Sequence, residues 1–231
     1  MISVRAAADR GQSEFHWLSS RHSFSFGHYY DPAHLGFGDL RVINEDRVVP
    51  GAGFDTHGHK DMEIITYVVD GAIEHRDSLG TEGVLKAGDV QRMTAGTGIM
   101  HSEYNHSSRD PLHFLQIWIE PDRRGLPPSY EQKSFSSETA GDWQILASPD
   151  GDQGSLSIHQ DVRIFGSKSS EGAHLRHRLD PGRKAWIQLV RGQAEINGVD
   201  ARGGDGLAIE GENEIDVIVR EPTELLLFDL R

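Results

Sequence analysis

The chain has 231 residues, which is enough for one large or two modest domains. Its net charge of −13 argues against nucleic-acid binding and against an anionic membrane surface. The absence of cysteine excludes disulfides, thiolate catalysis and iron–sulfur clusters. No run has the length of a transmembrane helix and the N-terminal segment lacks the apolar core of a signal peptide, so we expect a cytoplasmic protein.

In chain order, the first half contains short β-branched runs separated by turn residues, which predict strands at 40–49, 62–71, 72–78, 89–95 and 112–120. The polar segment 121–142 has three prolines and no periodicity, and it predicts a connection between two domains. Strand-like runs resume at WQILAS and continue to ELLLFDL near the C-terminus. Because no long amphipathic helix appears, the pattern favours an all-β sandwich or barrel.

An internal repeat indicates two copies of one β-domain. YVVDGAIE (67–74) parallels QLVRGQAE (188–195), and KAGDV (86–90) parallels RGGDG (202–206) in the same order. We therefore predict an N-terminal domain over 1–133 and a C-terminal domain over 134–231.

Two pairs of metal-ligand residues lie far apart in the sequence. His57 and His59 alternate in the first pair, and His101 and Glu103 alternate in the second. Alternate residues of a strand point to one face, so three imidazoles and one carboxylate converge if both strands line one barrel. This donor set suits iron, manganese, nickel, cobalt, copper or zinc rather than calcium or magnesium. The sequence leaves open whether the site is closed and tetrahedral or has free positions.

Other polar residues of this region are given weaker roles. We expect His75 to be exposed and His106 to lie in a turn, whereas His113 could line the pocket. Glu63 is either a carboxylate that orients an imidazole or a surface charge. The aromatic residues Phe24, Phe26, Tyr29 and Tyr30 are candidates for the pocket entrance or for the core.

Two longer segments resemble the cupin motifs: PGAGFDTHGHKDMEIITYVVDG (50–71) and AGDVQRMTAGTGIMHSEYN (87–105). The particular residues of these motifs, together with HSFSFGHYYDP (22–32) and HQDVRIF (159–165), are similar to those of the pirin family. The similarity extends over nearly the whole chain. Thr94 stands where most cupins have proline and the spacing before His101 is lengthened, but pirins share both departures.

The resemblance implies a bicupin, with two jelly-roll-like β-barrels in one chain and metal only in the N-terminal one. Its implied metal ligands are His57, His59, His101 and Glu103, with Fe(II) as the expected metal. It also implies a dioxygenase of the quercetin 2,3-dioxygenase type that takes a flavonol-like aromatic substrate and dioxygen, with Glu103 as catalytic general base. The alternatives are a non-enzymatic metal- or redox-sensing regulator that binds a protein partner, and a cupin isomerase or sugar-binding protein with a structural metal.

The C-terminal copy lacks this chemistry. His57 and His59 precede Gly71 by 14 and 12 residues. The same separations counted back from Gly192 lead to Arg178 and Asp180, and no histidine follows His177. We expect this domain to supply packing and the protein to be a monomer. Because coordination needs neutral imidazoles, we expect metal affinity to weaken as pH falls through about 6.5.

Overall fold

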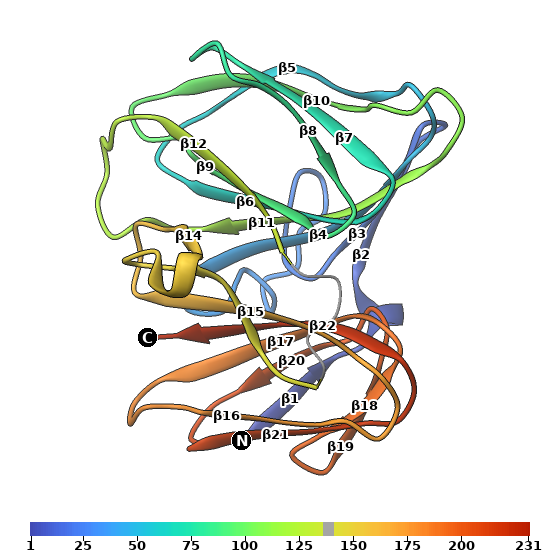
Figure 1. Ribbon diagram of the computed structural model, residues 1–231, viewed down its shortest axis with the longest axis vertical. Coiled ribbons are helices and arrows are strands. Elements are labelled where there is room, and N and C mark those ends of the chain that lie inside the picture. The colour runs from blue at the N-terminus through green and yellow to red at the C-terminus, as the bar shows by residue number, and fades with distance from the viewer. Residues whose placement is uncertain (136–140) are drawn as a thin grey trace. The chain divides into compact units, whose positions relative to one another are not determined.

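The computed structural model describes residues 1–135 and 141–231, which form two compact units built almost entirely of strands (Figure 1). Among the described residues, the N-terminal unit comprises 11–135 and 156–160, and the C-terminal unit comprises 1–10, 141–155 and 161–231. Within the described residues, two short 3-10 helices, Ala7–Asp9 and Asp152–Gly154, interrupt the strands. The all-β prediction is therefore confirmed. In the described part of the chain, no helix is long and apolar enough to cross a membrane.

The N-terminal unit has two layers of antiparallel strands. The larger sheet has the order β12-β9-β6-β11-β4-β3-β2, and the smaller has the order β5-β10-β7-β8. The bounds are β2 (Gly11–Glu14), β3 (Leu18–His22), β4 (Leu40–Val48), β5 (Gly53–His59), β6 (Glu63–Asp70), β7 (Ala72–Asp77), β8 (Glu82–Lys86), β9 (Asp89–Thr94), β10 (Ile99–Asn105), β11 (Leu112–Ile119), β12 (Ser129–Ser134) and the short β14 (Leu156–Ser157).

The C-terminal unit repeats this arrangement. Its larger sheet runs β1-β20-β17-β22-β15-β13 and its smaller sheet runs β16-β21-β18-β19. The bounds are β1 (Ile2–Arg5), β13 (Gln144–Ser148), β15 (Val162–Ser169), β16 (His174–Arg178), β17 (Lys184–Arg191), β18 (Gln193–Ile196), β19 (Val199–Arg202), β20 (Gly206–Ile209), β21 (Glu214–Val219) and β22 (Thr223–Leu230). Strand β1 pairs with β20 as β12 pairs with β9, so each unit has the same strand order.

The repeated glycines occupy equivalent turns. Gly71 and Gly192 have φ of 81° and 88°, a left-handed conformation that glycine adopts without the strain that a Cβ adds. In both places a Cβ would also lie within 2.6 Å of a proline carbonyl oxygen, that of Pro111 or Pro222. The turns before β9 and β20 match as well, because Asp89 and Asp205 each accept a backbone N–H from three residues earlier. These contacts explain why the two short sequence matches occur in the same order.

The cores of the two units differ in extent. The C-terminal unit contains one large cluster of buried aliphatic residues from both of its sheets. The N-terminal unit has smaller clusters, one around Val68, Leu112 and Phe114 and another around Ile64 and Met93.

Two features of the connections differ from the sequence-based expectation. The segment 121–142 is not a plain linker, because β12 lies within it and pairs with β9; its residues 136–140 lie outside the described ones. The compact units also differ from a single boundary between residues 133 and 134. The first ten residues contact the C-terminal unit through the pairing of β1 with β20, whereas 156–160 contact the N-terminal unit.

The strand register corrects the counted equivalents of the histidines. His57 pairs with His101 in the N-terminal unit, and His177 pairs with Ile215 in the C-terminal unit. His177 is therefore the counterpart of His57, rather than Arg178. The count was wrong because His177 precedes Gly192 by 15 residues, whereas His57 precedes Gly71 by 14.

Candidate metal centre

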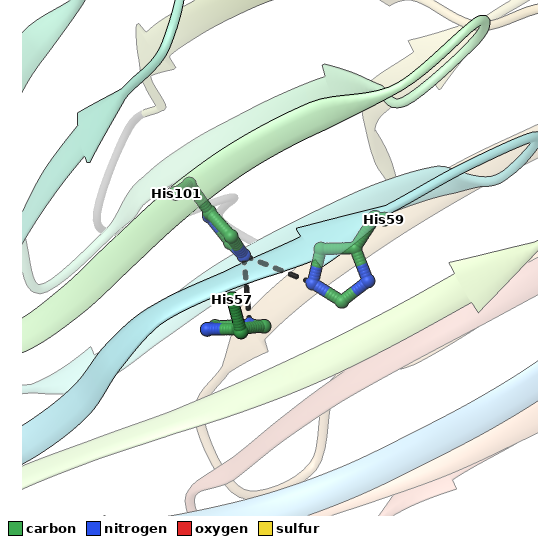
Figure 2. A group of neighbouring side chains, drawn as sticks. All are labelled: His57, His59 and His101. Atoms are coloured by element: carbon green, nitrogen blue, oxygen red, sulfur yellow. Dashed lines mark hydrogen bonds between the residues drawn. The ribbon is translucent and has the colours of Figure 1, made fainter.

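The two candidate ligand pairs lie on neighbouring antiparallel strands. His57 and His59 lie on β5, and His101 and Glu103 lie on β10, where His101 stands directly opposite His57. A register shift between His101 and Glu103 locally disrupts the ladder, as a β-bulge does. Figure 2 shows the rings of His57, His59 and His101 pointing toward one another from the two strands.

The three imidazoles meet at their Nε2 atoms. His101 Nε2 lies 3.0 Å from His57 Nε2 and 3.0 Å from His59 Nε2 (Figure 2). Metal–nitrogen bonds of about 2.1 Å at right angles place two ligand atoms about 3.0 Å apart. The observed separations therefore fit three nitrogens arranged around one divalent cation.

The positions of the protons on the rings also indicate that a cation fits between them. His57 Nδ1 lies 2.8 Å from the carbonyl oxygen of Asp55, so this nitrogen carries the proton of the neutral ring and donates it. His57 Nε2 then carries no hydrogen, and its lone pair faces His101. His101 Nε2 has a single lone pair or a single hydrogen, and it cannot make ordinary hydrogen bonds to both neighbours. A cation that accepts the lone pairs accounts for the arrangement, and the residues present fit a metal.

Glu103 lies beside the imidazoles and is held on both oxygens. Its Oε2 is 4.0 Å from His101 Nε2 and accepts a hydrogen bond from Gln116 Nε2 at 2.9 Å. Its Oε1 is 3.3 Å from the hydroxyl of Thr66. These buried donors fix the orientation of a carboxylate that is only 3% exposed.

Burial keeps two of the imidazoles neutral. Burial, together with a smaller effect of the neighbouring imidazoles, lowers the pKa of His59 to about 4 and that of His101 to about 3. Both rings are consequently uncharged near pH 7. This is the form in which histidine binds a metal.

A cavity of about 640 Å³ adjoins the imidazoles, and His57, His59 and Glu103 are among its lining residues. Its apolar wall comes from Phe15, Trp17, Leu18, Phe26, Phe54 and Trp118. The edge of Trp118 packs against His59, with ring centroids 5.0 Å apart and planes at 83°. Polar side chains line another part of the cavity: Ser13, Ser20, His22, Asn44, Asp46 and Gln116. The site thus combines flat apolar surfaces with hydrogen-bonding groups.

The expected entrance aromatics have different fates. Phe26 lines the cavity and packs edge-on against Trp118. Phe24 is buried, Tyr30 is exposed, and the ring of Tyr29 stacks with that of His22. One of the four therefore borders the cavity.

The weaker sequence-based roles are partly wrong. His75 is fully buried rather than exposed, and its Nδ1 lies 3.5 Å from His101 Nδ1. Its position between the polar Glu74 and Arg76 was the available signal, since successive residues of a strand face opposite sides. His75, His101 and Glu103 consequently form a second group of converging ligand atoms.

The remaining candidates lie away from the imidazole cluster. Glu63 is fully buried and its Oε2 contacts His159, so it is neither a surface charge nor an orienting carboxylate for His57, His59 or His101. His113 pairs with Glu45 and does not line the cavity, and His106 is exposed and contacts Glu74.

Two jelly-roll units in one chain, with clustered imidazoles inside one of them, define a bicupin. Residues 3–119 match the family model described as Pirin, and residues 145–230 match the one described as Quercetinase C-terminal cupin domain. The chain therefore belongs to the pirin family, as the sequence resemblance predicts.

Named relatives agree with this assignment. The chain is 47% identical over 230 residues to the quercetin 2,3-dioxygenase of Escherichia coli (strain K12), covering 100% of this chain and 99% of that protein. It is 42% identical over 231 residues to the pirin-like protein of Caulobacter vibrioides, covering 99% of each. The crystal structure of the bacterial pirin YhhW in complex with nickel(II) from Escherichia coli matches with a TM-score of 0.95 and 47% identity, covering 100% of this chain and 99% of that one.

Proposed function

We propose that this protein is a metal-dependent dioxygenase of the quercetin 2,3-dioxygenase type. The observation that carries the proposal is the cluster of three imidazoles and one carboxylate beside a cavity with aromatic walls. The names of its relatives support the same reaction class. The proposed substrates are a flavonol-like aromatic molecule and dioxygen.

The proposed ligands are Nε2 of His57, His59 and His101, together with a carboxylate oxygen of Glu103. They would hold one divalent metal, a role supported by the nickel(II) complex of the Escherichia coli pirin. We propose Fe(II) as the working metal, with nickel, zinc, manganese, cobalt and copper as the alternatives that this donor set also suits.

The cavity suits a flat, hydroxylated molecule. Trp17, Phe54 and Trp118 offer ring surfaces against which an aromatic substrate can pack. Asp46 lies among the lining residues, and its Oδ1 is buried without a hydrogen-bond partner in the described residues. A substrate hydroxyl that donates to this oxygen would satisfy it, and an unmet buried acceptor costs about 1–3 kcal/mol.

The residues of the chain divide the chemical work. A bound metal supplies Lewis acidity, which lowers the pKa of a coordinated substrate hydroxyl. Glu103 would accept the proton of that hydroxyl at a carboxylate oxygen. Gln116 and Thr66 keep this carboxylate oriented while it takes up the proton. The aromatic walls exclude water from the electron-rich substrate, which then reacts with dioxygen.

The test is turnover of quercetin by protein reconstituted anaerobically with Fe(II) and then exposed to air. We expect loss of the flavonol absorbance with matching oxygen uptake, and we expect His101→Ala to abolish both. His106→Ala removes an exposed histidine of the same unit and should retain the rate. Absence of turnover with every first-row divalent metal, in protein that binds metal, would contradict this activity.

A further inference from the structure

A buried contact chain leads away from the imidazole cluster to a carboxylate. His75 and Asp77 lie two residues apart on β7, which pairs with β10. His75 Nε2 is 3.0 Å from Asp77 Oδ2, and His75 Nδ1 is 3.5 Å from His101 Nδ1. Both side chains of the His75–Asp77 pair are inaccessible to solvent. The contacts therefore run from Asp77 through His75 to the far side of the His101 ring.

Asp77 is also fixed by the turn that follows it. Its Oδ1 accepts the backbone N–H of Leu79 at 2.9 Å and that of Thr81 at 3.0 Å. Although burial alone would raise the pKa of Asp77, its hydrogen bonds to His75, Thr81 and Leu79 outweigh burial and lower it. Asp77 is thus a carboxylate that only accepts hydrogen bonds.

The positions of the protons follow from this acceptor. His75 must donate from Nε2 to Asp77, which leaves a lone pair on Nδ1 in the neutral ring. His101 must then carry its proton on Nδ1 to meet that lone pair. Its Nε2 is left as a lone pair that points toward His57 and His59, where the metal is proposed to bind.

Tyr130 holds His75 in this orientation. Its ring stacks on the imidazole with centroids 4.7 Å apart and planes at 29°. The phenol hydroxyl donates to Gln132 Oε1 at 2.6 Å, so the phenol does not compete for a nitrogen of His75.

We propose that Asp77 and His75 form a relay that fixes the tautomer of His101 and so presents its Nε2 lone pair to the metal. The relay rests on the proposed metal site and makes both members positioning residues. Partners that orient a metal-bound histidine typically contribute about 10–100-fold to metal affinity.

The decisive variant is Asp77→Asn. The amide oxygen can still accept the N–H groups of Leu79 and Thr81, which preserves the turn. Its NH₂ group would instead face His75 Nε2, and this nitrogen would have to accept. The proton of His75 would then move to Nδ1 and that of His101 to Nε2, where it blocks the metal.

Two readouts follow in the full-length protein. In protein freed of metal, ¹⁵N–¹H correlation of the imidazoles should show His101 protonated at Nδ1 in wild type and at Nε2 in Asp77→Asn. Calorimetric titration with Ni(II) should show a Kd about 10–100-fold weaker for the variant. Asp110→Asn removes the same charge from a turn elsewhere in the unit and should change neither quantity. Unchanged tautomer and Kd in Asp77→Asn would overturn the relay.

His75→Phe separates positioning from direct ligation. It removes both contacts but leaves His101 free to adopt either tautomer, so we expect one bound Ni(II) and a smaller loss of affinity than in Asp77→Asn. Complete loss of metal, as in His57→Ala, would make His75 a ligand and overturn its positioning role. Neither readout involves flavonol turnover, so failure of the proposed activity would leave the relay standing. Failure of wild type to bind Ni(II) would overturn the metal site and the relay together.

Discussion

The two units share one scaffold but fill it with opposite kinds of side chain. One row across five neighbouring strands of the N-terminal unit is polar: His22, Asn44, Gln116, Thr66 and Gln91. The matching row of the C-terminal unit is apolar: Ile145, Phe165, Leu227, Ile187 and Leu207. The strand order therefore does not determine whether the interior is a site or a solid core.

The positions of the proposed site follow the same contrast. The strand pairings equate His75, His101 and Glu103 with the buried Ile196, Ile215 and Val217. In the N-terminal unit the polar row serves the site, because Gln116 and Thr66 contact Glu103. In the C-terminal unit the same layer contributes burial of apolar surface instead.

The largest expected effect comes from removing a proposed metal ligand of the N-terminal unit. His57→Ala should weaken Ni(II) binding by more than about 100-fold, because a direct ligand contributes more than the 10–100-fold of an orienting partner. His177→Ala, at the register-equivalent position, should leave metal content unchanged. Elemental analysis after dialysis against Ni(II) measures both. Equal metal loss in the two variants would contradict the assignment of the site to one unit.

The second prediction introduces a polar side chain into the apolar row of the C-terminal unit. Leu227→Gln copies Gln116 into the C-terminal unit, and it should lower the free energy of unfolding by about 3 kcal/mol or more, through lost apolar burial and an unpaired amide. Urea unfolding with matched slopes measures the change. The volume-conserving Leu227→Met should cost less than about 1.5 kcal/mol. A Leu227→Gln protein as stable as wild type would show that this layer tolerates polar groups.

The sequence predicted the features that depend on local spacing. Alternation placed His57 and His59 on one face of a strand, and the paired glycine turns indicated the duplication. The register of β5 against β10 then brought His57 opposite His101, which spacing alone could only suggest. The four proposed ligands could thus be predicted from the sequence because each pair lies within a single strand.

Features that depend on distant pairing were not predictable in this way. Nothing local in ISVR indicates that β1 completes the C-terminal sheet, and β12 lies in a proline-rich segment whose composition suggests a loop. His75 was misjudged because its alternation with Glu74 and Arg76 does not say which face of the strand is buried, and the pairing that places His75 opposite Glu103 of β10 decides it. Long-range register, not propensity, decides such cases.

A smaller effect is expected where the polar row touches the site. Gln116→Leu removes the donor to Glu103 Oε2 and should weaken Ni(II) binding by about 10-fold, the lower end for an orienting partner. Gln91→Leu changes the same row at a residue that contacts Thr66 rather than Glu103, and it should leave the Kd unchanged. Calorimetric titration compares the two. Equal weakening by both variants would indicate a general loss of packing instead of a specific contact.

The last expected effect concerns protons in the metal-free protein. His59 and His101 have folded-state pKa values of about 4 and about 3, below the ordinary histidine value of 6.5, because burial disfavours their charged forms. Between these values and pH 6.5 the unfolded chain binds protons that the folded chain does not. The free energy of unfolding therefore falls progressively as pH drops below 6.5, and the loss is complete below about pH 4 for His59 and about pH 3 for His101. His101→Phe removes one such group and should flatten the dependence by about 1.4 kcal/mol per pH unit between pH 4.5 and 6. Urea unfolding in chelator at several pH values measures the slopes. Parallel slopes for the two proteins would show that His101 is not held neutral by burial. Protons should likewise compete with a bound metal for His59 and His101 only near pH 4, rather than near the 6.5 expected from ordinary histidines.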